Sequence, residues 1–290
     1  MIARRDALFG AVPQHRFVNS DRVRFHYLEW DNNGPPIVLV HGTGFHAYVW
    51  KPIAQLLSQS FRVLALDQRG HGDSSKPEGG YGWNDFGDDL HRFLDALGLA
   101  HVTAVGHSAG ATAIAYCSAH HPGSVAKAVL IDPILFPRAA QAQAGRNHAP
   151  LVQPARKRRT VWESRTSMFH SYRTRSPLNT WREDVLWAYI EEGTFLRPDG
   201  HVELKCPASI EAQIFDQAGS LDSSGILPRV SIPVLVLRGE NSDAFTESDA
   251  TTAASLLANA TSKTIGRASH FVPMERPDAV ERAIRQFLHR

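Results

Sequence analysis

Five short and mostly apolar runs constrain the fold of this chain more than any other feature of its sequence. They are Ile37–Val40, Phe61–Leu66, His101–Gly106, Val125–Ile131 and Pro233–Leu237. Strands that do not alternate between apolar and polar residues are covered on both faces, as in a parallel sheet flanked by helices. We therefore expect these runs to form the buried strands of such a sheet. A partly alternating stretch at residues 23–30 predicts a further strand near an edge.

The segments between the runs have helical patterns. Apolar residues recur at three- and four-residue steps from Phe86 to Leu97, and Gly98 stands where a helix C-cap belongs. Residues 111–120 are rich in small side chains, and residues 280–288 carry another apolar stripe. Because strand and helix alternate, the sequence predicts an α/β fold.

The alternation stops between residues 134 and 227, where the chain becomes polar, basic and rich in tryptophan. Residues 135–205 contain 12 Lys and Arg against 7 Asp and Glu, a net charge of +5. We expect a helical cap, or lid, at residues 134–227, inserted into a core formed by residues 1–133 and 228–290. The basic run Arg156–Arg159 could bind an anion or a membrane headgroup, but such runs are more often a solvated helix face, which is our interpretation.

The overall composition excludes several classes of protein. The 290 residues include 31 Lys and Arg against 29 Asp and Glu, so the net charge of +2 gives no basic excess for nucleic-acid binding. No apolar run approaches the roughly 18 residues of a membrane span. The apolar stretch at residues 7–12 is too short for a signal peptide, and we expect an exposed arm there.

The two cysteines, Cys117 and Cys206, are far apart in the sequence and fit no metal spacing. They favour a reduced, cytoplasmic setting. The oligomeric state is left open, with a homodimer as one option.

The most informative motif is Gly106-His107-Ser108-Ala109-Gly110, which lies between an expected strand and an expected helix. A Gly-x-Ser-x-Gly pattern in this position reverses the chain sharply, and only small residues fit where the strand and the helix approach each other. The turn projects the Ser108 hydroxyl beyond the carboxyl end of the strand. Ser108 is therefore the candidate nucleophile.

A second glycine-containing segment, His41-Gly42-Thr43-Gly44, directly follows an expected strand. A loop there can present backbone N–H groups to the negative charge that develops on a tetrahedral intermediate. We expect the N–H groups of Thr43 and Ala109 to form this oxyanion hole. The glycines also permit a tight turn, and both interpretations can hold.

A serine nucleophile requires a base, usually an imidazole that a carboxylate holds in one tautomer. His270 lies in the loop before the last expected helix, where it can return to the sheet edge, and we assign it as the base. Asp243 follows the penultimate strand, gives the order Ser, Asp, His, and is the preferred carboxylate. Asp132, at the end of an earlier strand, is the alternative. For Asp67, a salt bridge with Arg69 inside their loop is the favoured interpretation.

Taken together, these segments resemble the α/β-hydrolase superfamily over nearly the whole chain. The matching motifs, in the order of the family, are HGTG at 41–44, DQRGHGDS at 67–74, GHSAG at 106–110, RGENSD at 238–243 and SHFVPMERP at 269–277. The resemblance implies a mostly parallel eight-stranded sheet, a helical cap between strands six and seven, and a triad of Ser108, His270 and Asp243. A serine at position 108 argues against the dehalogenase and epoxide-hydrolase branches, which have aspartate there. Ser269 departs from the glycine that relatives often have, which concerns only the local conformation of its loop.

This triad predicts hydrolysis of a carboxylic ester of a small or medium substrate through an acyl-enzyme intermediate. One alternative is hydrolysis of a carbon–carbon bond in a vinylogous diketone acid, whose carboxylate would need cationic partners. Another is a non-catalytic, ligand-binding role. No metal or organic cofactor is expected, because neither a nucleotide-binding glycine pattern nor a zinc-binding cluster is visible.

Aromatic residues of the expected cap have two interpretations. They form an apolar substrate pocket or, as is more common, they hold the cap to the core. The residues concerned are Trp162, Phe169, Tyr172, Trp181 and Trp187.

Overall fold

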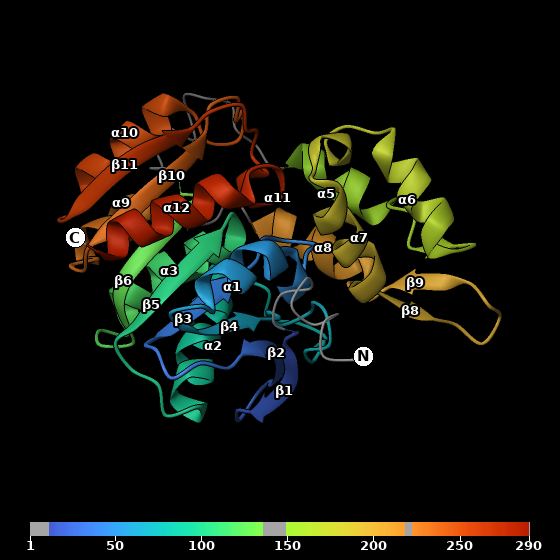
Figure 1. Ribbon diagram of the computed structural model, residues 1–290, viewed down its shortest axis with the longest axis horizontal. Coiled ribbons are helices and arrows are strands. Elements are labelled where there is room, and N and C mark those ends of the chain that lie inside the picture. Colours follow the sequence, from blue (N-terminus) through green and yellow to red (C-terminus); the bar gives the residue numbers. More distant parts are fainter. Residues whose placement is uncertain (1–11, 136–148, 218–221, 290) are drawn as a thin grey trace, which may run out of the picture.

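An eight-stranded sheet forms the centre of the molecule (Figure 1). The computed structural model describes residues 12–135, 149–217 and 222–289, so the expected arm at residues 7–12 lies, except for its last residue, outside the described residues. Neighbouring strands follow the order β1-β2-β4-β3-β5-β6-β10-β11. Their bounds are β1 Gln14–Asn19, β2 Arg24–Trp30, β3 Pro36–Val40, β4 Arg62–Leu66, β5 Val102–His107, β6 Val125–Ile131, β10 Val234–Gly239 and β11 Ala260–Ile265.

The sheet is mostly parallel, as expected. Only the pairs β1 with β2 and β2 with β4 are antiparallel, and the pairs from β4 through β11 are parallel. The strand expected near an edge is β2, and β1, which the sequence analysis did not predict, lies outside it. Together with the helices described below, this confirms the α/β fold.

The buried strands carry apolar side chains on both faces of the sheet. In β3, Ile37 and Leu39 belong to the core on one face, whereas Val38 and Val40 belong to the core on the other. Successive side chains of a strand point to opposite faces, so a strand covered on both sides is apolar throughout. The outermost strands β1 and β11 have mostly exposed side chains and carry no such run.

Helices cover both faces of this sheet (Figure 1). α1 and α12 contribute to the core on the side of Ile37, and α2, α3 and α10 contribute to the core on the side of Val38. No helix among the described residues has the length and apolar character needed to cross a bilayer. The bounds are α1 Lys51–Leu57, α2 Trp83–Ala96, α3 Ala109–His120, α9 Ser223–Ile226, α10 Glu247–Leu256, α11 Val272–Glu275 and α12 Pro277–Leu288.

The chain between β6 and β10 builds a separate group of elements, which we call the inserted segment (residues 149–217). Besides the expected helices it contains a small antiparallel sheet of order β7-β9-β8. This sheet was not expected from the sequence, because its strands have only two or three residues. The β8–β9 hairpin projects away from the main sheet in Figure 1. The bounds are α5 Ala149–Arg156, β7 Val161–Trp162, α6 Arg165–Arg173, α7 Glu183–Glu192, β8 Thr194–Leu196, β9 Val202–Leu204 and α8 Ala208–Gln217.

Apolar and polar contacts attach the inserted segment to the rest of the molecule. Side chains of α7, among them Val185 and Leu186, are fully buried in the same apolar core as α1 and α12. Lys205 Nζ lies 2.7 Å from a carboxylate oxygen of Asp73. The Trp83 indole N–H donates to the backbone carbonyl of the last residue of α8 at 2.8 Å.

The two cysteines lie in different parts of the molecule. Cys117 is in α3, beside the main sheet, and Cys206 is in the inserted segment, between β9 and α8. Both are free thiols and buried. Burial raises the pKa of each thiol to about 12.

Candidate active site

Ser108 occupies the sharp turn between β5 and α3. Its backbone has φ +52° and ψ −119°, a conformation that residues with side chains rarely adopt. The flanking glycines are required by contact: a Cβ on Gly110 would lie 2.2 Å from the Val40 carbonyl oxygen, and one on Gly106 would lie 2.6 Å from the backbone nitrogen of Ala111. The structure thus supports the steric reason that the sequence suggested for this motif.

His270 lies between Ser108 and a carboxylate. Its Nε2 is 3.1 Å from Ser108 Oγ, and its Nδ1 is 2.7 Å from Asp132 Oδ1. A carboxylate accepts a hydrogen bond from Nδ1–H, so this contact leaves the Nε2 lone pair facing the serine hydroxyl. An imidazole in this tautomer can remove a proton from the hydroxyl.

The prediction of Asp243 as the partner of His270 is wrong. The alternative, Asp132, makes the contact. Asp132 directly follows β6, the strand next to β5, and therefore lies beside the serine turn. Asp243 comes four residues after β10 ends, and its side chain is exposed on the wall of a cavity. The order Ser, Asp, His along the chain suggested Asp243. The order of the strands in the sheet, in which β6 lies beside β5, places Asp132 at the histidine.

Asp132 is completely buried and has three hydrogen-bond donors. Besides His270, Ser242 Oγ donates to Oδ1 at 2.6 Å, and the Gly239 N–H donates to Oδ2 at 2.9 Å. Ser242 was missed in the sequence analysis. Its signal was its place directly before Asp243, within the RGENSD motif at residues 238–243.

Two side chains fix the loop that carries His270. The His107 Nε2–H donates to the His270 backbone carbonyl at 2.9 Å. Ser269, which departs from the usual glycine, donates through Oγ to one oxygen of Glu275 at 2.8 Å and through its backbone N–H to the other at 2.7 Å. The serine is therefore part of the loop's hydrogen bonding.

The backbone N–H groups of Thr43 and Ala109 are available as donors near Ser108. In the part of the chain that the structure describes, neither group has a hydrogen-bond acceptor. The two loops are close, because a Cβ on Gly42 would lie 3.1 Å from Ser108 Cβ. Two unpaired donors beside a nucleophile can stabilise an oxyanion.

Two buried histidines hold the loop of residues 41–44. His71 Nε2 accepts the Gly44 N–H at 3.0 Å, while its Nδ1–H donates to a backbone carbonyl at 2.8 Å. His41 Nε2 accepts the Gln68 N–H at 3.1 Å. Burial lowers the pKa of His41 to about 4 and that of His71 to about 3. Both rings are therefore neutral, as their acceptor roles require.

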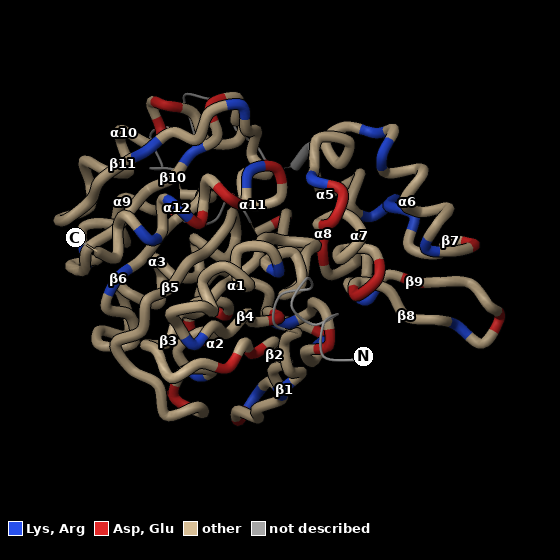
Figure 2. The backbone as a smooth tube through the Cα atoms, in the orientation of Figure 1, with Lys and Arg blue, Asp and Glu red and all other residues tan. Residues whose placement is uncertain are grey.

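A cavity of about 960 Å³ opens at Ser108 and His270. Its walls come from the loops of the main sheet and from the inserted segment. Four basic and two acidic side chains line it: Lys157, Arg158, Arg159, Arg175, Glu211 and Asp243. Figure 2 shows the basic residues of the inserted segment along α6 and the neighbouring chain.

The basic run Arg156–Arg159 does not form a helix face, which corrects our interpretation in part, whereas Arg156, Lys157 and Arg159 are exposed to solvent, as expected. α5 ends at Arg156, so the residues that follow share no helix face. The Arg158 side chain is only 21% exposed and pairs with Glu211 at 2.6 Å, and the Arg159 guanidinium lies 4.1 Å from the centre of the Trp162 ring. Three residues of the run line the cavity.

The aromatic residues of the inserted segment divide between the two interpretations. Trp162 and Tyr172 line the cavity. Trp181 is 1% exposed and belongs to the apolar core, and Phe169 stacks on Trp187 with ring centres 4.2 Å apart. Some of these side chains thus shape the pocket, while others pack the segment.

The Asp67–Arg69 salt bridge does not form, which corrects a further expectation. Asp67 accepts from His26 Nδ1 at 2.7 Å and from two backbone N–H groups, whereas Arg69 makes two hydrogen bonds of 2.6 Å with Asp89. His26, Asp67 and Asp73 are the one group among the described residues whose side chains could together hold a metal ion. The Asp67 oxygens, however, are already used in holding its loop.

A family model described as the alpha/beta hydrolase family matches residues 37–283. The chain belongs to this family. The 2-(acetamidomethylene)succinate hydrolase of Mesorhizobium japonicum is 38% identical over 117 residues, which cover 40% of this chain and 42% of that protein, less than half of its length. A non-heme chloroperoxidase of Streptomyces lividans is 27% identical over 90% of this chain and 94% of that protein.

Solved structures agree with this assignment. The crystal structure of E-2-(acetamidomethylene)succinate hydrolase superposes with a TM-score of 0.87 at 26% identity, covering 96% of this chain and 100% of that chain. Like its relatives, the chain is an enzyme of the α/β-hydrolase family, which sets aside the non-catalytic alternative.

The neutral histidines predict a loss of stability in acid. The unfolded chain binds protons on His41 and His71 near pH 6.5, whereas the folded chain resists protonation down to about pH 4 and about pH 3. The free energy of unfolding should therefore fall as the pH drops below about 6.5, by roughly 1.4 kcal/mol per pH unit for each histidine. Urea denaturation between pH 7 and pH 4.5 measures this slope.

In the variant His71→Gln, the amide oxygen can still accept the Gly44 N–H but does not titrate. The slope should become shallower by the contribution of one histidine. The exposed His170, changed to Gln, is the matched control and should leave the slope as it is in the wild type. An unchanged slope in His71→Gln would contradict the assignment.

Proposed function

We propose that this chain is a serine hydrolase that cleaves a carboxylic ester of a small or medium substrate through an acyl-enzyme on Ser108. One observation carries the proposal: the His270 ring has one nitrogen at Ser108 Oγ and the other at the buried carboxylate of Asp132. Ser108 is the nucleophile, His270 the base, and Asp132 the group that orients it, in the place given to Asp243 by the sequence analysis.

The reaction runs in two steps. His270 Nε2 takes the Ser108 proton as Oγ bonds to the carbonyl carbon, and it passes this proton to the alkoxide as the ester C–O bond breaks. The same nitrogen then removes a proton from water, which attacks the acyl carbon. The bond to Ser108 breaks, the proton returns to Oγ, and the acid leaves.

The N–H groups of Thr43 and Ala109 serve as the oxyanion hole in both steps. Each step passes through a tetrahedral oxyanion, and donors already in place stabilise it without reorganisation. Their lack of other acceptors among the described residues supports this role. No metal or organic cofactor takes part in this scheme.

The inserted segment acts as a cap over this site. We propose the boundaries expected from the sequence, with a cap at residues 134–227 and a core of residues 1–133 and 228–290. The shared cavity supports this division, since Trp162 and Tyr172 of the segment line it together with Ser108 and His270 of the core. Closing the cavity limits access of water and orients a small-molecule substrate.

The substrate carries a carboxylate at a distance from the scissile bond. Four basic side chains against two acidic ones give the cavity wall a positive balance. Lys157 and Arg175 have no ion-pair partner within the described ranges, so they can pair with a substrate anion. The similarity to a succinate derivative's hydrolase supports an acidic substrate. The same wall suits the vinylogous diketone acid of the carbon–carbon alternative.

Replacing the nucleophile tests the reaction directly. The variant Ser108→Ala should lower kcat by at least roughly 10³-fold, because no other group can form the acyl-enzyme. Its melting temperature should stay close to that of the wild type, since the hydroxyl contacts only the His270 ring. A fluorophosphonate should label Ser108, as located by peptide mass mapping. An adduct on another residue would refute the assignment.

The two aspartates make a matched pair for the orienting role. Asp132→Asn should lower kcat by roughly 10⁴-fold, because the amide cannot hold His270 in the required tautomer. Asp243→Asn changes an exposed residue in the same way and should have a far smaller effect. Ester turnover measured for both variants checks this ranking, and the opposite order would return the role to Asp243.

Paired substrates test the anion. The 4-nitrophenyl ester of succinic acid, with a free carboxylate, should have a kcat/KM about tenfold or more above that of 4-nitrophenyl butyrate, because a charge-assisted hydrogen bond contributes about 1.5–3 kcal/mol. Arg175→Gln and Lys157→Gln should raise KM for the charged ester alone. Equal values of kcat/KM for both esters would exclude recognition of a substrate carboxylate. A ring-fission dienoate in the same panel tests the carbon–carbon alternative.

A further inference from the structure

Gly44, directly after the Thr43 donor, is held from both sides. Its N–H donates to His71 Nε2 at 3.0 Å, and its carbonyl accepts the hydroxyl of Tyr189, from α7, at 3.3 Å. Its φ of +79° lies in the region that favours glycine. The Gly44 N–H and carbonyl belong to the two peptide groups that directly follow the Gly42–Thr43 peptide, which carries the Thr43 N–H. Tyr189 therefore connects the inserted segment to the loop that carries the oxyanion donor.

The hydrogen bonding around Tyr189 sets the direction of its hydroxyl proton. Arg158 Nη2 donates to the hydroxyl oxygen, and a guanidinium has donors only. The oxygen must therefore accept from Arg158, which leaves its own proton for the Gly44 carbonyl. Glu211 fixes the arginine through Nη1 at 2.6 Å. Burial raises the pKa of Tyr189 well above that of an exposed tyrosine, so the phenol keeps its proton at physiological pH.

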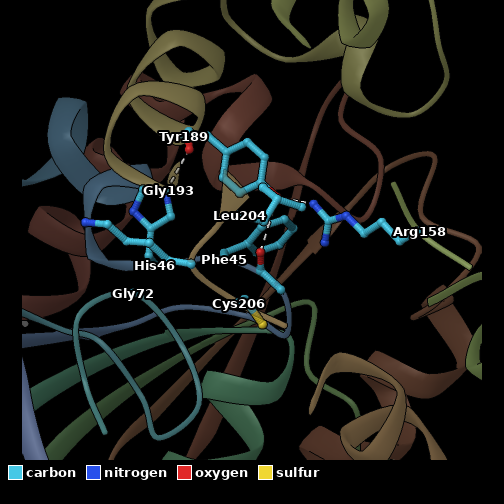
Figure 3. Close-up of a pocket in the computed structure, with 10 residues that line it drawn as sticks. Phe45, His46, Gly72, Arg158, Tyr189, Gly193, Leu204 and Cys206 are labelled. Carbon is cyan, nitrogen blue, oxygen red and sulfur yellow. Dashed lines mark hydrogen bonds between the residues drawn. The ribbon is translucent and has the colours of Figure 1, made fainter. Parts of the chain in front are cut away.

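The ring of Tyr189 is itself fixed by packing. Figure 3 shows it beside His46, whose ring is stacked on it with centres 5.5 Å apart and planes 11° apart. His46 Nε2 also contacts the Tyr189 backbone carbonyl at 2.9 Å. Phe45 and Trp181 approach the ring edge-on. The side chain is 2% exposed. A hydroxyl on a ring held in this way has a defined position.

Glu211 reaches the same glycine from the other direction. A Cβ on Gly44 would lie 2.8 Å from Glu211 Oε1 and 3.3 Å from Arg158 Nη1. The three side chains Arg158, Tyr189 and Glu211 thus surround Gly44, and all belong to the inserted segment. We call them the Gly44 clamp.

We propose that Tyr189 is a positioning residue for the oxyanion hole, which it holds through the Gly44 carbonyl, and that Arg158 and Glu211 orient its hydroxyl. This inference rests on the proposed hydrolase function. It gives the inserted segment a part in stabilising the transition state, beyond covering the substrate. The clamp acts on the donor loop and contributes no donor of its own to the oxyanion.

The variant Tyr189→Phe removes the hydroxyl and keeps the ring packing. Loss of a whole oxyanion donor costs about 10²–10³ in kcat, and a displaced donor keeps part of its effect, so we expect kcat to fall roughly tenfold or more with KM nearly unchanged. The rate of phosphonylation of Ser108 should fall by a similar factor, because the phosphoryl oxygen occupies the same hole. Steady-state kinetics with 4-nitrophenyl butyrate and a timed labelling assay measure both.

A matched control removes the same kind of bond elsewhere. Tyr81 is a buried tyrosine whose hydroxyl donates to the Pro77 carbonyl at 2.7 Å, and it is not among the residues that line the cavity. Tyr81→Phe should leave kcat and the labelling rate unchanged. Thermal melts of both variants separate a folding defect from a change in the loop.

A second variant tests whether Arg158 acts through the Tyr189 hydroxyl. Arg158→Lys keeps the charge but cannot hold Glu211 and the Tyr189 hydroxyl together. If the arginine acts through the hydroxyl, the double variant Arg158→Lys with Tyr189→Phe should lose little more kcat than Tyr189→Phe alone. Additive losses in kcat would overturn this order of action. Should Tyr189→Phe fold poorly, Arg158→Lys alone supplies the test: it should lower kcat for 4-nitrophenyl butyrate with KM nearly unchanged, and an unchanged kcat would overturn the proposal.

Three further results have distinct meanings. A wild-type protein that neither turns over esters nor labels at Ser108 refutes the proposed function. A fully active wild type whose Tyr189→Phe variant matches it in kcat and labelling rate refutes the clamp alone. A raised KM with unchanged kcat in Tyr189→Phe makes the hydroxyl a substrate contact, which also overturns the positioning role.

Discussion

The buried carboxylate of Asp132 is the group on which the arrangement of the site depends. It stands at the end of β6 and accepts hydrogen bonds from His270, Ser242 and Gly239. Gly239 ends β10, Ser242 lies in the loop that follows it, and His270 lies in the loop before α11, so a single acceptor holds both loops against the sheet. A carboxylate without exposure is costly unless it is fully hydrogen-bonded. The pairing that orients the imidazole is therefore also a requirement of the fold.

Local features of the sequence predicted much of this molecule, because they have local causes. A strand covered on both faces is apolar in every position, as in β3, and a turn without room for a Cβ requires glycines, as around Ser108. The strands β1 and β11, exposed at the edges, leave no such signature. The partner of His270 depends on which strand lies beside β5 in the sheet. The residues that flank Asp132 and Asp243 in the sequence do not indicate which strand lies beside β5.

Charged side chains of the inserted segment were harder to place, since their partners are distant in sequence. Arg158 and Glu211 are separated by 53 residues. Arg69 binds Asp89, which is 20 residues away, and not the nearby Asp67. A run of four basic residues suggests one solvated surface. Here the helix ends at the first of them, and the next three turn towards the cavity. The burial of Arg158 and its ion pair with Glu211 follow from tertiary packing, which the run itself does not indicate.

The positions of the two thiols have a practical consequence. Each is buried and holds its proton at neutral pH, so alkylating reagents can reach either sulfur only when the surrounding structure opens. Cys206 borders the small hollow beside Tyr189, whereas Cys117 lies under the main sheet. Faster modification of Cys206 than of Cys117 would therefore indicate a local opening of the inserted segment, whereas equal rates would indicate a global opening of the protein.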